Sequence, residues 1–174
     1  VTPFAIPLAQ AGFGEGEARA IRGFEGFEAI AVAGNRVYLS IEVQDGDAMA
    51  AHLTSGRVDV DGRGIPIGIT LDEAPTVPVA LPAAIDNMSL EALFADGDGV
   101  TALFEANGAA VNASPRAYRF AADLTPLGEV PFPAIEYRIT DAGALGPDGT
   151  LWVVNYMFPG DADDLRPGPD GIAA

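Results

Sequence analysis

The sequence lacks cysteine altogether, and this absence excludes disulfide bridges, thiolate metal sites and cysteine nucleophiles. It contains a single histidine, His52, so a zinc or iron centre built from several histidines of one chain is also excluded. No apolar run approaches the ~20 residues that a membrane-spanning helix needs, so we expect no membrane insertion. Any bound metal is therefore expected to be a hard cation held by oxygen atoms.

Positive charge is scarce as well. The chain has 25 acidic residues against nine basic ones, all arginine, and a formal net charge of −16. Such a surface repels nucleic acid and attracts cations, so we expect no nucleic-acid partner. An acidity that serves only solubility is the alternative. The first residues lack the basic start of a signal peptide, but the acidity suits a calcium-rich setting, and we expect a periplasmic or secreted protein.

Glycine and proline are abundant, with 21 and 14 residues spread along the chain, which favours short strands joined by turns. One pattern occurs three times: an apolar segment, a turn containing Gly, Asn or Asp, and a second apolar segment. This pattern is typical of a β-hairpin. The three copies align without gaps at 27–42, 90–105 and 140–155.

Repeats at roughly this interval are typical of the four-stranded blades of a β-propeller. Further strands are predicted at 48–58 and 65–71 after the first hairpin, and at 117–120 and 127–130 after the second. The third hairpin leads only into a tail, 159–174, that we expect to be loop-like. The fold class predicted is therefore all-β, a single partial β-propeller domain over 1–174, with blades starting near 27, 90 and 140.

This chain would cover about two and a half blades of such a propeller. A closed ring needs at least about four blades. We therefore expect that the rest of the propeller is missing from this chain or is supplied by another chain. The segment 18–22 is expected to form an outer strand that closes the ring. Tyr38 and Trp152 are predicted to pack between blades.

Each hairpin begins with an acid and ends, 14 residues later, with another oxygen-bearing side chain. Both ends of a hairpin lie at one end of its sheet, and the first strand of each blade lines the channel, so these side chains should converge on one mouth. Converging carboxylates become protonated or bind a cation. Solvated strand ends are the alternative. The six candidate metal ligands are Glu28, Glu42, Glu91, Glu105, Asp141 and Asn155.

An oxygen-only set of ligands favours Ca²⁺, with Mg²⁺ less suitable because it needs stricter geometry. Asp86 and Asn87 lie just before the second hairpin and could add ligands. The acidic segment at Asp161, Asp163 and Asp164 could hold a second cation, although a solvated loop is the simpler interpretation.

The segment 23–32, Gly-Phe-Glu-Gly-Phe-Glu-Ala-Ile-Ala-Val, resembles the start of a blade in phytase-like esterase propellers and related calcium-binding six-bladed propellers. The segment 147–153, Pro-Asp-Gly-Thr-Leu-Trp-Val, is a common propeller hairpin phrase. The resemblance implies six blades, an axial calcium ion and a pocket above it. In hydrolytic members the calcium ion polarises a phosphate, lactone or ester oxygen, and the match places Glu28, Glu91 and Asp141 at axial ligand positions.

Two functions follow as expectations. The first is a calcium-dependent hydrolase acting on an ester, lactone or phosphoester at the axial mouth, where the metal acts as a Lewis acid. The second is a non-enzymatic binding module with a structural calcium ion, whose mouth binds a small molecule or a protein. No catalytic residue can be assigned from the sequence, and fold alone does not choose between the two.

Overall fold

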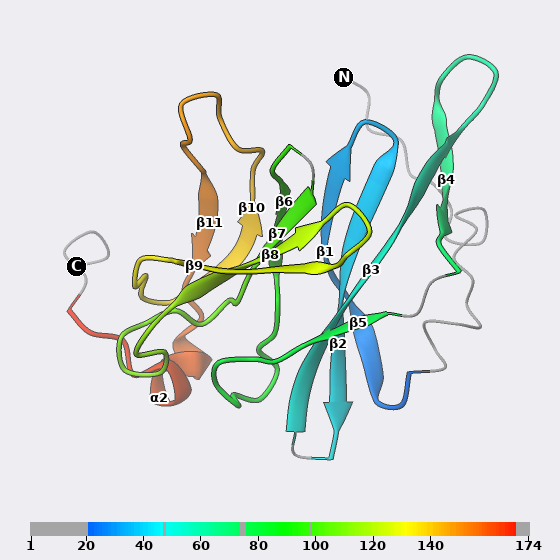
Figure 1. Ribbon diagram of the computed structural model, residues 1–174. Coiled ribbons are helices and arrows are strands. Elements are labelled where there is room, and N and C mark those ends of the chain that lie inside the picture. Colours follow the sequence, from blue (N-terminus) through cyan, green and yellow to red (C-terminus); the bar gives the residue numbers. More distant parts are fainter. Residues whose placement is uncertain (1–20, 47, 74–75, 98, 170–174) are drawn as a thin grey trace.

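A computed structural model describes residues 21–46, 48–73, 76–97 and 99–169, and nearly all regular structure in these ranges is β-strand (Figure 1). The all-β class predicted from the sequence is confirmed. All pairings between the strands are antiparallel. No helix in these ranges is long and apolar enough to cross a membrane.

The first sheet consists of consecutive strands, each paired with the next, plus one short strand that pairs with the third. Gly34, with φ of 64°, occupies the tight turn after the first strand, a backbone conformation that glycine adopts without strain. The strands are β1 (Phe24–Ala33), β2 (Arg36–Asp45), β3 (Ala48–Val60), β4 (Pro66–Leu71) and β5 (Val77–Val79).

The second sheet repeats this arrangement with four strands in the order of the sequence. In both sheets the third and fourth strands lie where the sequence predicts them. The strands of the second sheet are β6 (Ala92–Ala95), β7 (Gly99–Leu103), β8 (Arg116–Ala121) and β9 (Pro126–Pro131).

The third sheet is a two-stranded hairpin of β10 (Arg138–Ala142) and β11 (Val153–Tyr156). The predicted loop-like tail is partly wrong, because its beginning forms a 3₁₀ turn, η2 (Pro159–Asp161), and one turn of α-helix, α2 (Ala162–Leu165). The buried side chain of Leu165 attaches this helical turn to the main core. Most of the outer strand expected at 18–22 lies outside the described residues, and Ile21 and Arg22 precede β1 without joining a strand.

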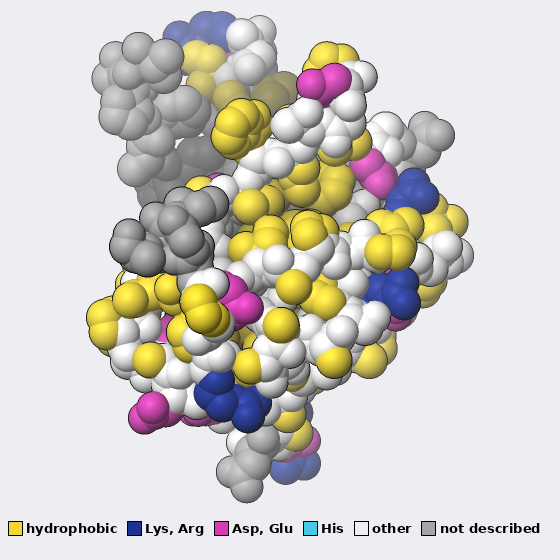
Figure 2. All heavy atoms as spheres, turned by 90° about the vertical axis from the view of Figure 1, so that its left-hand side faces the viewer, with side chains coloured by type: hydrophobic (Ala, Val, Ile, Leu, Met, Phe, Trp, Pro, Cys, Tyr) yellow, Lys and Arg dark blue, Asp and Glu magenta, His cyan; other side chains and the backbone are white. Residues whose placement is uncertain are grey.

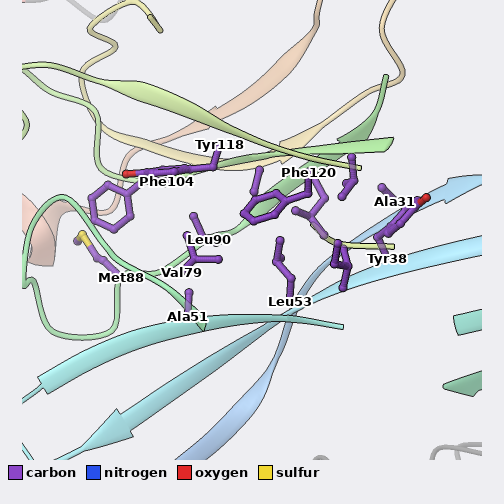
Figure 3. Close-up of a cluster of buried hydrophobic side chains, with 14 of the residues drawn as sticks. Ala31, Tyr38, Ala51, Leu53, Val79, Met88, Leu90, Phe104, Tyr118 and Phe120 are labelled. Carbon is purple, nitrogen blue, oxygen red and sulfur yellow. The ribbon is translucent and has the colours of Figure 1, made fainter. Parts of the chain in front are cut away.

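The first strands of successive sheets are neighbours, since β1 contacts β6 and β6 contacts β10. A large apolar core fills the space between the first and second sheets, and Leu53, Leu90 and Phe104 are completely buried in it (Figure 3). A smaller core, which includes Phe94 and Ile139, lies between the second sheet and the third hairpin. The three sheets are therefore stacked through their apolar faces.

Tyr38 and Trp152 are both predicted to pack between blades, but only Tyr38 is buried. Tyr38 is buried in the core between the first two sheets, as expected. The prediction for Trp152 is wrong, because this side chain is the most exposed large hydrophobic group of the described residues. Trp152 precedes β11, and its side chain is not part of the core against which Leu151 and Val153 pack.

Candidate functional site

Arg138, the first residue of β10, lies at the centre of a cluster of acidic side chains. Its guanidinium group forms ion pairs with Glu91 at 2.8 Å, with Glu105 at 2.5 Å and with Asp161 at 3.3 Å. The cluster is largely shielded from water, since the side chain of Arg138 is 13% exposed and that of Glu105 is 0% exposed. Arg138 therefore joins the second sheet, the third hairpin and the turn η2.

The backbone around Arg138 fixes this arrangement. Glu91 immediately precedes β6, and the amide of Glu105, just beyond β7, donates a hydrogen bond to the carbonyl oxygen of Ser89 at 3.0 Å. The amide of Ile139 in turn donates to the carbonyl oxygen of Glu105 at 2.9 Å. Tyr137 has a φ of 66°, a left-handed conformation that bulky residues rarely adopt and that is typical of positions held by their surroundings.

Burial and like charge strongly perturb Glu105. Burial, a hydrogen bond with Glu91 and the charge of Glu91 together raise the pKa of Glu105, while Arg138 opposes these effects. Burial by itself lowers the pKa of Arg138, but the charges of Glu105 and Glu91 raise it above its ordinary value.

Glu28 and Glu42 belong to the same electrostatic cluster from the first sheet. Burial raises the pKa of Glu42 to about 7, with further contributions from the charges of Glu28 and Glu91. Burial and Glu91 also raise the pKa of Glu28, which lies at an irregularity of the β1–β2 pairing. The hydroxyl of Ser40 fixes this region, because it accepts a hydrogen bond from the amide of Ala29 at 2.9 Å and donates one to the carbonyl oxygen of Leu90 at 2.7 Å.

The structure thus brings together four of the six candidate ligands, Glu28, Glu42, Glu91 and Glu105. The third pair lies apart and exposed. The carboxylate of Asp141 accepts a hydrogen bond from the amide of Ala142 at 2.8 Å, and the amide group of Asn155 donates one to the carbonyl oxygen of Glu136 at 2.8 Å.

The third hairpin differs in where its regular strand begins. The regular part of β10 begins at Arg138, three residues before Asp141, and an irregularity after Ile139 pairs Asp141 with Val154. Arg138 consequently takes the place at the start of the strand that the sequence alignment gave to Asp141. Sequence reasoning missed Arg138 because a gapless alignment of the repeats does not show a bulge.

A calcium site needs six to eight oxygen ligands around one ion. Within 21–46, 48–73, 76–97 and 99–169, no three His, Cys, Asp or Glu side chains are placed to hold one metal ion. Glu91 and Glu105 instead face the guanidinium group of Arg138. The six predicted ligands therefore do not fit a single calcium ion, and calcium binding stays a prediction.

A pocket of about 480 Å³ is built from segments close to this cluster. Its lining includes Asp86, which accepts a hydrogen bond from Gln44 at 2.9 Å, and Asp163 and Asp164 of α2. Arg166 is the basic residue of this lining, and its side chain donates to the carbonyl oxygen of Ala110 at 3.0 Å. The acidic character of the cluster thus extends onto the adjoining surface.

No family model, no curated protein and no solved structure matches this chain. The fold itself defines the chain as an all-β protein built from stacked antiparallel sheets.

Replacing Glu42 by glutamine should make stability less dependent on pH. The folded-state pKa of Glu42 is raised to about 7, so as pH rises from about 4.5 to 7 the unfolded chain loses this proton first and stability falls. Glu42→Gln should match the wild type near pH 4.5 and exceed its free energy of unfolding by roughly 1–2 kcal/mol near pH 8, in urea titrations with EDTA.

The exposed Asp141 offers a matched control for this experiment. Asp141→Asn removes the same charge outside the cluster, and its stability curve should run parallel to that of the wild type between pH 4.5 and 8. If the free energy of unfolding of Glu42→Gln changed with pH as that of the wild type does, the pKa of Glu42 would not be raised in the folded protein.

Proposed function

We propose that this chain is part of a propeller-type ring that acts as a binding module, and that the end of the ring at the Arg138 cluster binds a cation. Three findings support the ring. The first two sheets each contain four strands paired in the order of the sequence, to which the first sheet adds the short β5; the three sheets stack on one another, and their first strands are neighbours. These are the features of consecutive blades.

The observation that carries the cation site is the imbalance of charge in the cluster. Three carboxyl groups, from Glu91, Glu105 and Asp161, contact the single guanidinium group of Arg138, and Glu28 and Glu42 add two more acidic groups within electrostatic range. In the described part of the chain, no arginine forms an ion pair with Glu28 or Glu42. Burial is the main cause of the raised pKa values of both groups, and repulsion from neighbouring carboxylates adds to it. A bound cation would offset both effects.

Calcium is the first ion to test, and magnesium the second. The carboxylates of Glu28 and Glu42 would be its protein ligands, because Arg138 already neutralises Glu91 and lies against Glu105. Two carboxylates supply fewer oxygen atoms than the six to eight that Ca²⁺ takes, so water or further protein oxygens would complete the shell.

A calcium-dependent hydrolase acting on an ester, lactone or phosphoester is the second candidate. It shares the charge imbalance that favours a cation at Glu28 and Glu42, and the bound ion would in addition have to act as a Lewis acid on a substrate oxygen. The binding module ranks first, because it requires only the charge imbalance.

The test of the proposed function is a calorimetric titration of the chain with CaCl₂ at pH 7.5. We expect saturable binding that weakens at least about tenfold in Glu42→Gln, since a buried ligand charge is lost. Asp141→Asn, which removes a charge outside the cluster, should bind calcium as the wild type does. An absence of binding heat in the folded wild-type chain, or equal weakening in both variants, would disprove the site.

A further inference from the structure

A stripe of exposed apolar side chains runs along β11 and the residues next to it. Side chains two positions apart on a strand share one face. At the even positions Trp152 is 79% exposed, Val154 53%, Tyr156 47% and Phe158 51%. On the opposite face Leu151 and Val153 pack against the core beneath the third hairpin. The strand is therefore apolar on both faces, although only one of them is covered.

The equivalent strands of the other two sheets are covered on both faces. Every residue of β7 is buried, and so is β2 from Val37 to Val43. Figure 2 shows the side of the molecule where β10 and β11 lie, and hydrophobic side chains gather across it. β7 lies between the first sheet and the third hairpin, and by comparison with it the exposed face of β11 lacks a layer packed upon it.

The other end of the stack also carries exposed apolar side chains. On β1, Ala29, Ala31 and Ala33 pack against the core that joins the first two sheets, whereas Ile30 and Val32 are about half exposed. Within the stack, β1 lies against β6 and β6 against β10. If this series continued beyond the third hairpin, a sheet equivalent to the first one would lie against the stripe on β11.

We propose that two copies of this chain associate head to tail, with the stripe of each copy (Trp152, Val154, Tyr156 and Phe158) packed on Ile30 and Val32 of the other. Two copies of three sheets give a closed ring of six, within the range of about 4–8 blades of known propellers. The two contacts are identical, so the ring closes with two-fold symmetry. This inference rests on the propeller arrangement of the proposed function.

The aromatic side chains of the stripe supply about half of the surface of such a contact. Aromatic side chains bury roughly 150–250 Å² each, so the exposed fractions of Trp152, Tyr156 and Phe158 amount to roughly 400 Å². A stable interface buries about 800 Å² per partner, so Val154 and the neighbouring surface of β11 must supply the rest. Both copies are strongly acidic, so salt should strengthen the association by screening their repulsion.

The association would also complete the cation site. One copy contributes two carboxylates, Glu28 and Glu42, that lack an arginine partner among the described residues. A two-fold ring brings the corresponding end of the second copy to the same mouth and doubles the oxygen ligands available. Calcium should then bind the associated form more tightly than the single chain.

Sedimentation velocity over roughly 1–100 µM protein, in 0.5 M NaCl with EDTA, tests the association without any cation. We expect a mass near 36 kDa, twice the 17.9 kDa of the chain, and a dissociation constant raised at least tenfold in Trp152→Glu. Ile67→Glu on β4 introduces the same charge at an exposed apolar residue away from both contacts, and should leave the mass unchanged.

Ile30→Glu distinguishes head-to-tail packing from a contact between two stripes. It should weaken association as Trp152→Glu does, and mixing the two variants should restore one intact contact and a species of twice the chain mass. A single-chain mass at all concentrations, no effect of Ile30→Glu, or species that keep growing with concentration would overturn the proposal. A ring that forms but binds no calcium would support it and contradict only the proposed function.

Discussion

Replacing Arg138 by methionine should lower the free energy of unfolding by roughly 3–5 kcal/mol at pH 7.5, because it leaves shielded carboxylates without their cation. Glu91 and Asp161 would lose their ion pairs, and the side chain of Glu105 is fully buried against the same guanidinium group. Methionine keeps most of the apolar volume, so the loss reports mainly on charge. Urea titrations at pH 7.5 and pH 4 would measure it, and it should shrink in acid as the carboxyl groups become protonated.

Arg119 provides the matched control, because its ion pair with Asp96 is far more exposed to water. Arg119→Met should cost no more than about 1 kcal/mol, as exposed pairs do. If Arg138→Met were equally mild, or if its effect were the same at both pH values, the Arg138 cluster would not hold the third hairpin in place.

Replacing Phe104 by alanine should destabilise the protein by roughly 3–5 kcal/mol, because it leaves a cavity in a core that cannot fully collapse. Phe104 has no exposed surface and lies among the side chains that join the first and second sheets (Figure 3). It is next to Glu105, so the variant should also loosen the Arg138 cluster from its apolar side. Urea unfolding followed by tryptophan fluorescence and circular dichroism would measure the loss.

Leu127 on β9 serves as the control for this substitution, since its side chain is largely exposed. Leu127→Ala should change stability by no more than about 0.5 kcal/mol. A Phe104→Ala variant that lost less than about 1 kcal/mol would mean that the two sheets do not share the tightly packed core described above.

The strands of the first two sheets, except the short β5, could be predicted from the sequence because local signals agree there. Apolar segments alternate with turns whose residues suit positive φ angles, as at Gly34 and Gly97, both of which adopt them. The third hairpin gave weaker signals, since Gly143, Gly146 and Gly149 extend its loop and the regular strand pairs farther from the turn. The sequence alone cannot show such a shift of register.

Convergence of Glu28, Glu42, Glu91 and Glu105 was predictable because each pair lies at the open end of a hairpin and the first strands of the two hairpins are neighbours. The role of Arg138 was not, because it depends on a bulge. Exposure of Trp152 was missed for another reason: a strand with apolar residues on both faces indicates burial, and whether a covering layer exists is a property of the assembly and not of the strand.

The Arg138 cluster also sets an order of assembly. Each of the first two sheets is made from consecutive strands and needs only short loops to close. The ion pair between Arg138 and Glu91 joins residues 47 positions apart in the chain, and such contacts form after local ones because a longer loop must close first. We therefore expect the Arg138 cluster to form after the hairpins that it joins.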